Sequence, residues 1–175
     1  MTSKNIILIP ARLESSRLKR KLLLNIADKS ILQHTYESSL NSKMSLKTII
    51  LVDSIELFTH CKTFTDDVLM TSKKHKNGTE RIYEYVKSSE TNFNIVNMQA
   101  DEPFTDHKLI DAIFKQLMDG NEIVTAVYEI SDNIIDPNRV KVVLDKNDFA
   151  LYFSRHEIPY NFCLLYTSPS PRDGQ

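Results

Sequence analysis

Hydrophobic and polar residues alternate in blocks along this chain, and the spacing within each block predicts an element of secondary structure. Short apolar runs, several of them rich in β-branched residues, are typical of buried strands. Such runs predict strands at 6–9, 48–52, 94–98, 123–128 and 140–144, a weaker extended piece at 67–70 and a further candidate at 150–154. Apolar residues at helical spacing predict helices at 31–40, 55–64, 82–86 and 109–118.

Strands that alternate with helices of this length predict an α/β fold, with a mostly parallel sheet and helices on both faces. In such sheets ligands bind beyond the carboxyl ends of the strands, at the point where the strand order reverses. The loops that follow residues 6–9 and 94–98 are the natural pair to flank that crevice.

The first of these loops is cationic. The apolar run stops at Pro10 and is followed by basic residues at Arg12, Arg17, Lys19, Arg20 and Lys21. The whole chain has three glycines and no P-loop motif, so glycine-rich backbone cannot be the main group that binds phosphates. Basic side chains would have to neutralise most of the phosphate charge. We favour Arg12 and Lys21 for that role, and a solvated basic loop is the alternative.

The second loop carries the opposite charge. The strand at 94–98 is followed by Asp101, Glu102 and Pro103. A hard cation such as Mg²⁺ takes carboxylate oxygens together with substrate phosphates, so Asp101 is a candidate metal ligand facing the cationic loop. The alternative is an acidic turn closed by Pro103, and Gln99 is either a specific donor or a plain loop residue.

The segment from His75 to Arg81 has two interpretations. Asn77 followed by Glu80 forms a pair like a capping box, with Gly78 easing the turn into a helix. Alternatively, Gly78 lets the edge of a base approach the backbone, with Arg81 nearby as a donor. On composition alone, we favour the interpretation of this segment as a helix cap.

Composition narrows the function classes. The chain has 175 residues, 41% of them hydrophobic, which is enough to bury a core. Its net charge is −1, so the protein as a whole has no positive electrostatic field that would attract nucleic acid or an anionic membrane. Two distant cysteines match no metal-ligand spacing and suit a reducing compartment. No run approaches a membrane span or a signal peptide, so we expect a cytoplasmic location.

Five motifs, in order, resemble the 3-deoxy-manno-octulosonate (Kdo) cytidylyltransferase family, also called CMP-Kdo synthetase. They read IPARLESSRL, HKNGTER, VNMQADEP, DPNRVKVV and ALYFSRHEIPY, and the resemblance covers Asn5 to Tyr160. It implies a Rossmann-like nucleotide-diphospho-sugar transferase fold and a homodimeric parent enzyme. It also implies transfer of CMP from CTP to Kdo, with Mg²⁺ as cofactor and release of pyrophosphate for lipopolysaccharide biosynthesis.

The resemblance assigns a role to each candidate site residue. It implies that Arg12, Lys21 and Asp101 are catalytic, with Asp101 as the metal ligand. Nucleotide binding falls to Ala11, Arg12, Ser15, Arg17, Lys21, Asn77, Gly78 and Arg81. Gln99 and Arg155 match positions near the sugar.

Two departures from the family affect this interpretation. Lys19-Arg20 stands where the family usually has Pro-Gly, so we expect a different loop before Lys21. Family members continue beyond Tyr160 with a second metal-binding aspartate, so we expect residues 1–162 to be an incomplete nucleotidyltransferase domain that is inactive or poorly folded alone. Residues 163–175 are expected to form a disordered tail.

The alternatives left open are of two classes. One is a cytidylyltransferase for a related acidic sugar, such as an amino-Kdo analogue or a sialic acid. The other is a non-catalytic nucleotide-binding fragment.

Overall fold

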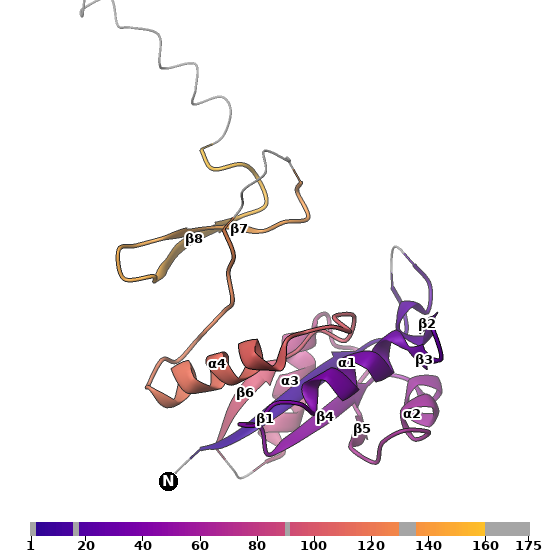
Figure 1. The fold of residues 1–175 in the computed structure, drawn as a ribbon. Coiled ribbons are helices and arrows are strands. Elements are labelled where there is room, and N and C mark those ends of the chain that lie inside the picture. The colour runs from indigo at the N-terminus through magenta and orange to yellow at the C-terminus, as the bar shows by residue number, and fades with distance from the viewer. Residues whose placement is uncertain (1–2, 16–17, 90–91, 130–135, 160–175) are drawn as a thin grey trace, which may run out of the picture. The chain divides into compact units, whose positions relative to one another are not determined.

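The computed structural model describes residues 3–15, 18–89, 92–129 and 136–159. The chain divides into two units, residues 1–126 and 127–175, and each is described by itself. The first unit contains, in order, β1 (Lys4–Ala11), the 3₁₀ helix η1 (Lys21–Leu23), β2 (Asn25–Ile26), β3 (Lys29–Ser30), α1 (Ile31–Ser39), β4 (Lys47–Val52), α2 (Ile55–Cys61), β5 (Val68–Met70), α3 (Gly78–Lys87), β6 (Phe93–Asn97) and α4 (His107–Met118). The second unit contains β7 (Lys141–Leu144) and β8 (Ala150–Ser154), as Figure 1 shows.

The first unit is built on a four-stranded parallel sheet in the order β5-β4-β1-β6. From β1 the chain moves outward through β4 to β5 and then returns to place β6 on the other side of β1. The strand order therefore reverses between β1 and β6, which is where a ligand crevice is expected in such a sheet.

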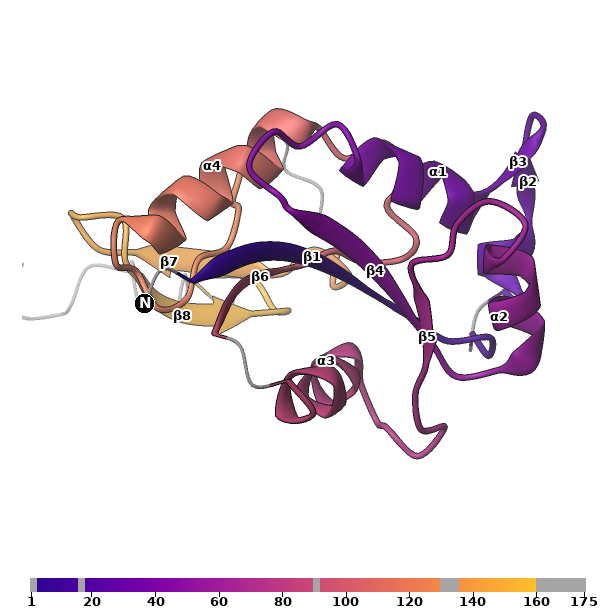
Figure 2. The ribbon, with the colours of Figure 1, turned by 90° about the horizontal axis from the view of Figure 1, so that it is seen from below.

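Helices cover both faces of this sheet, and the alternation of side chains along β1 explains why. Ile7 and Ile9 are completely buried in a cluster with side chains from α1, α2 and α4. Ile6 and Leu8 point to the other face and pack with Ile82 of α3. Figure 2 shows α1, α2 and α4 on one side of the strands and α3 on the other, which confirms the predicted fold class.

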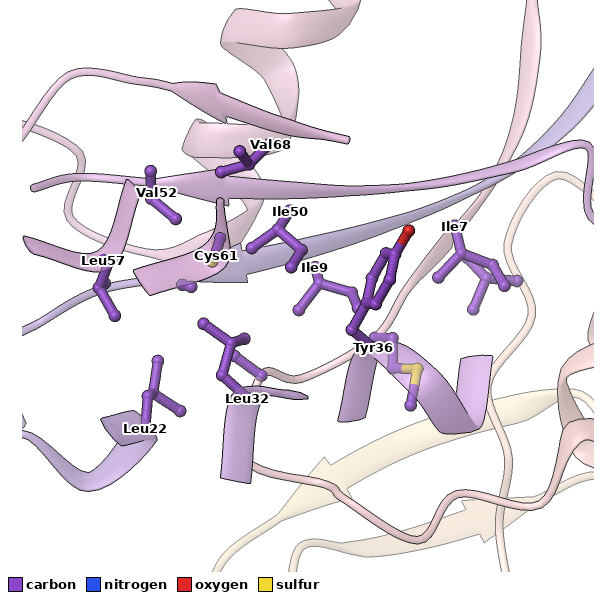
Figure 3. Close-up of a cluster of buried hydrophobic side chains, with 14 of the residues drawn as sticks. Ile7, Ile9, Leu22, Leu32, Tyr36, Ile50, Val52, Leu57, Cys61 and Val68 are labelled. Carbon is purple, nitrogen blue, oxygen red and sulfur yellow. The ribbon is translucent and has the colours of Figure 1, made fainter. Parts of the chain in front are cut away.

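The larger of the two clusters also anchors the segment that follows the first loop. Figure 3 shows Leu22 of η1 beside Leu32 of α1 and Leu57 of α2, below the strand residues Ile50 and Val52. Burial raises the pKa of the Cys61 thiol in this cluster to about 12, so Cys61 is a core residue rather than a reactive one.

Polar side chains begin the helices at the positions that the sequence predicts. Ser30 Oγ accepts a hydrogen bond of 3.1 Å from Gln33 N at the start of α1. Asn77 Oδ1 accepts one of 2.9 Å from Glu80 N at the start of α3. These caps satisfy backbone donors that have no partner within the helix.

Two expectations about the elements were wrong. The run at 123–128 forms no strand; Ile123 is 91% exposed, and a β-branched run needs a neighbouring strand to complete its hydrogen bonds. The predicted helix 55–64 ends at Cys61. The last two predicted strands exist as β7 and β8, but they form an antiparallel hairpin of their own in the second unit.

Two further observations bear on the expectations. The expected tail at 163–175 lies outside the described residues. Among the residues that are described, no helix combines the length and the hydropathy that crossing a membrane requires.

Candidate functional site

The loops after β1 and β6 meet at one ion pair. Lys21 Nζ lies 2.6 Å from Asp101 Oδ2, and the two side chains are 38% and 43% exposed. Lys21 opens η1, whose next residue, Leu22, is buried in the core. Because β1 and β6 are parallel neighbours, their carboxyl ends lie side by side, and the pair sits where the strand order reverses.

The backbone of the acidic loop is fixed on both sides of Asp101. Met98 N donates to Leu8 O at 3.1 Å, which extends the link to β1 beyond the end of β6. Thr35 Oγ1, completely buried on α1, lies 3.0 Å from the carbonyl oxygen of Ala100. Glu102 N donates to Gln99 O at 3.2 Å and closes a turn. The backbone on both sides of Asp101 is therefore held by β1, α1 and a turn within the loop.

The donor set at Asp101 fits one kind of metal site. Nowhere in the described part of the chain do three or more His, Cys, Asp or Glu side chains gather as a ready-made metal cage. A single exposed carboxylate is what Mg²⁺ uses when substrate phosphates and water supply its other ligands. Asp101 fits that arrangement, because its side chain faces solvent beside a cation that also attracts phosphate.

The cationic loop leaves β1 at the buried residue Ala11. Arg12, the next residue, is exposed, Ser15 is half-buried, and Arg17 lies outside the described residues. Leu13 N donates to the carboxylate of Asp53 at 3.0 Å, which holds the start of the loop against the end of β4.

At the end of this loop Arg20 is solvent-exposed, but its backbone conformation and its ion pair are defined. Arg20 adopts a left-handed conformation with φ of 55°, and its Nη2 lies 2.8 Å from Glu56 Oε2 on α2. A left-handed backbone favours glycine. The structure thus keeps at Arg20 a backbone shape suited to the glycine that the resembled family usually carries there.

The segment from Thr71 to Arg81 packs against the same edge of the sheet. Gly78 begins α3 directly beside Pro10, and a Cβ at Gly78 would lie 2.9 Å from Pro10 Cγ. Glu80 accepts from Lys76 N at 2.8 Å, which completes the capping pair with Asn77. The capping interpretation of this segment is therefore confirmed, and Gly78 has a second role in close packing.

Arg81 is the least exposed of the predicted site residues in the described chain after Ala11. Its side chain is 4% exposed, and its guanidinium donates to Thr71 Oγ1 and, at 3.3 Å, to Ser72 O. Its Nη2 lies 3.5 Å from Asp53 Oδ2. Burial, partly offset by Asp53, lowers the pKa of Arg81 from its ordinary value, although the group stays charged. Arg81 thus holds the loop before α3 from the inside.

A cavity of about 540 Å³ lies on the other side of β6, between that strand, α4 and residues 122–126. Its polar lining includes Asn97, Gln99, Glu102 and Thr105, and its apolar lining comes from β6 and the residue after it, from α4 and from residues 123–126. Gln99 and Glu102 flank Asp101 in the sequence, so this cavity adjoins the ion pair. Arg155 belongs to the second unit, where its Nη1 donates to Pro137 O at 3.4 Å.

The sequence analysis missed two residues that hold the site together. Thr35 and Asp53 contact the two loops from neighbouring elements. Asp53 could have been predicted as a site residue, because it follows an apolar strand in the same way as the acidic loop follows the strand at 94–98. Thr35 lies among the residues whose spacing predicts the helix at 31–40, and this local pattern carries no signal of a contact with a distant loop.

Comparisons with known proteins agree on one family. A family model described as "Cytidylyltransferase" matches residues 6–165. The 3-deoxy-manno-octulosonate cytidylyltransferase of Rhodopirellula baltica is 42% identical over 98% of this chain and 66% of that protein. The protein of the same description from Neisseria meningitidis serogroup C is 39% identical over 89% of this chain and 63% of its own length. The chain thus spans less than two thirds of either relative.

A solved structure is similar over nearly the whole chain. The structure of CMP:2-keto-3-deoxy-manno-octonic acid synthetase complexed with CTP matches with a TM-score of 0.79 and 30% identity. The match covers 91% of this chain and 67% of that one.

Proposed function

The chain belongs to the cytidylyltransferase family, and on that premise we propose that it transfers CMP from CTP to Kdo, with release of pyrophosphate. The observation that carries the proposal is the contact of 2.6 Å between Lys21 Nζ and Asp101 Oδ2 at the point where the strand order reverses. A cation and a carboxylate at that point are the two groups that a magnesium–nucleotide complex needs. The proposed role is in lipopolysaccharide biosynthesis.

The proposed reaction needs little covalent chemistry from the protein. The anomeric hydroxyl oxygen of the sugar attacks the α-phosphorus of CTP in line, the new O–P bond forms, and the bond to pyrophosphate breaks as the hydroxyl proton is lost. Positioning and electrostatic stabilisation then determine the rate. In this proposal Lys21 and the exposed Arg12 stabilise the charge on the phosphates. Mg²⁺, held by Asp101 and the phosphates, would supply further charge stabilisation when bound.

The remaining residues divide the substrates between them. We assign Ala11, Ser15 and Arg17 to the loop around the triphosphate. We assign the start of α3 to the cytosine ring, where the backbone of Asn77 and Gly78 would contact the base. Arg81 would hold this segment in place through its hydrogen bond to Thr71. Gln99, which lines the cavity beside Asp101, and Arg155 are assigned to the acidic sugar.

The assembly and location are part of the same proposal. The hairpin of β7 and β8 exposes Phe149, Leu151, Tyr152 and Phe153, each more than half exposed. A two-stranded hairpin with apolar side chains on its surface is marginal in water by itself, which supports a homodimer. A cytoplasmic location is proposed because the substrate CTP is made and used there.

Titration calorimetry with CTP and Mg²⁺ tests the nucleotide part of the proposal. We expect CTP to bind more tightly than UTP or ATP, and Lys21→Met to weaken CTP binding at least about ten-fold, the effect of losing one charge-assisted hydrogen bond. Lys29→Met is the matched control, because Lys29 pairs with Glu37 at 2.7 Å with similar exposure but on β3 and α1. A Lys21→Met protein that binds CTP like the parent, or a parent without preference for CTP, would contradict the proposal.

A further inference from the structure

Asp53 touches both of the segments that the proposed function assigns to the nucleotide. It follows β4 and precedes Ser54, the cap of α2. The register places Ala11 of β1 beside Val52 of β4, so Asp53 and the loop after β1 leave the sheet as neighbours. From this position Asp53 Oδ1 accepts from Leu13 N at 3.0 Å.

The second oxygen of Asp53 faces α3. Asp53 Oδ2 lies 3.5 Å from Arg81 Nη2, and the two side chains are 15% and 4% exposed. If one member of a pair this well buried is removed, the other charge stays buried without a partner. Losing such a pair therefore destabilises the structure around it far more than losing an exposed pair does.

Arg81 passes the link on to the loop before α3. Its Nη1 donates to Thr71 Oγ1, and Thr71 Oγ1 lies 2.8 Å from Val52 O at the end of β4. The end of β4, the loop after β5 and the start of α3 are therefore joined through one guanidinium. Every fully buried side-chain nitrogen or oxygen atom in this network has a hydrogen-bond partner among the described residues.

We propose that Asp53 is a positioning residue that couples the triphosphate loop to the cytosine segment, so that the two bind one nucleotide as a single unit. The inference rests on the proposed function for the identity of the ligand. Its structural basis is independent of that identity: one carboxylate fixes the residue after Arg12 with one oxygen and Arg81 with the other. Without Asp53 each segment would retain its own groups but lose its fixed distance from the other.

The coupling predicts a specific pattern of binding by fragments of the nucleotide. Binding of whole CTP depends on both segments at once, whereas tripolyphosphate alone or cytidine alone depends on one of them. We therefore expect Asp53→Asn to weaken CTP binding at least ten-fold while changing the affinity for tripolyphosphate and for cytidine by less than three-fold. Asparagine keeps an acceptor for Leu13 N but places a neutral amide against Arg81.

Two controls separate positioning from general destabilisation. Asp67→Asn removes a carboxylate just before β5 that pairs at 2.7 Å with Lys47, at the start of β4, and it should leave all three affinities unchanged. Asp53→Ala removes the acceptor for Leu13 as well, so amide hydrogen exchange at Leu13 should accelerate at least ten-fold, with the amides of β1 unaffected. This exchange measurement requires no nucleotide.

The outcomes distinguish this inference from the proposed function. Equal loss of affinity for CTP and both fragments, or unchanged CTP binding and unchanged exchange at Leu13, would overturn the positioning role of Asp53. A parent protein that binds no CTP would overturn the proposed function, while accelerated exchange at Leu13 in Asp53→Ala would still support the link between the loops.

Discussion

Lys21 and Asp101 are separated by 80 residues in the chain, yet Nζ of one lies 2.6 Å from Oδ2 of the other. The contact joins the two loops that leave β1 and β6 at the reversal of strand order. Both side chains remain more than one-third exposed, so the pair contributes little to stability, about 0–1 kcal/mol for pairs of this kind. Because the Lys21–Asp101 pair has a defined geometry but contributes little to stability, a ligand can separate the two side chains at low cost.

Removing the carboxylate should therefore separate activity from stability. In the chain extended with the C-terminal part of the relative that is 42% identical, we expect Asp101→Asn to lower turnover on the order of 10²-fold or more, as the loss of a preorganised electrostatic group does. We expect it to shift the free energy of unfolding by less than about 1 kcal/mol. Steady-state kinetics and urea unfolding measure the two effects. Glu37→Gln, in the comparable pair with Lys29, is the control that should leave turnover intact. An Asp101→Asn protein with full turnover would remove Asp101 from the metal role.

Gly78 should be required for the close contact between α3 and β1. Alanine is the better helix former, but its Cβ would lie 2.9 Å from Pro10 Cγ. We expect Gly78→Ala to destabilise the protein by about 1–3 kcal/mol through overpacking, and to do so much less when Pro10 is also changed to alanine. Thermal unfolding of the two single variants and the double variant measures this coupling. Additive effects would mean that Pro10 is not the cause.

Arg20 should prefer glycine despite its ion pair. The left-handed backbone, with φ of 55°, costs about 1 kcal/mol for a residue with a side chain, whereas an exposed pair with Glu56 contributes about the same or less. Arg20→Gly should therefore unfold at an equal or higher temperature than the parent. Arg20→Ala loses the pair and keeps the strain, so it should be the less stable of the two by about 1 kcal/mol. The reverse order would show that the backbone at position 20 relaxes.

Asp111 should make stability depend on acid. This side chain on α4 accepts from Ser42 Oγ at 2.6 Å and from the backbone N–H groups of Lys43 and Met44, which fixes the turn before β4. Burial raises the pKa of Asp111, but these hydrogen bonds outweigh it, and the net pKa lies below the ordinary value. A lowered pKa in the folded state means that the contribution is present above about pH 4 and is lost as the pH falls through the folded pKa.

The variant that checks this is Asp111→Ala. At neutral pH it should cost about 1–3 kcal/mol, because the donors of the turn lose their acceptor, and the difference from the parent should shrink in acid. Denaturant unfolding at several pH values from 7 to 3 measures the trend. Asp119→Asn, exposed at the other end of α4, is the control. A cost that stays constant down to pH 3 would exclude a titrating role for Asp111.

Local patterns were enough to predict most of the sheet, because strands such as 6–9 and 48–52 and caps such as Ser30 are encoded by neighbouring residues. The meeting of the two loops could also be predicted, since it follows from strand order alone. The resemblance to the Kdo cytidylyltransferase family is confirmed by the cytidylyltransferase family match over residues 6–165 together with the relatives of that description that are 42% and 39% identical.

What could not be predicted depends on distant partners. Asp53 gains its importance from Leu13 and Arg81, which lie 40 and 28 residues away in the chain. The run at 123–128 has the composition of a strand, but no strand among the described residues pairs with it. From its sequence Arg81 is expected to be an exposed donor at the start of a helix. Tertiary packing instead makes it the one buried charged residue in the described part of the chain.

The measurement that tests the central claim most directly is pyrophosphate release from CTP and Mg²⁺ with a panel of acidic sugars. It should be made on this chain and on a version extended with the C-terminal part of the relative that is 42% identical. We predict release by the extended protein, with Kdo preferred over sialic acid and an amino-Kdo analogue, and its loss in the Asp101→Asn variant. If neither protein releases pyrophosphate although both are folded and bind CTP, the proposed catalysis is contradicted. The chain would then be a nucleotide-binding module.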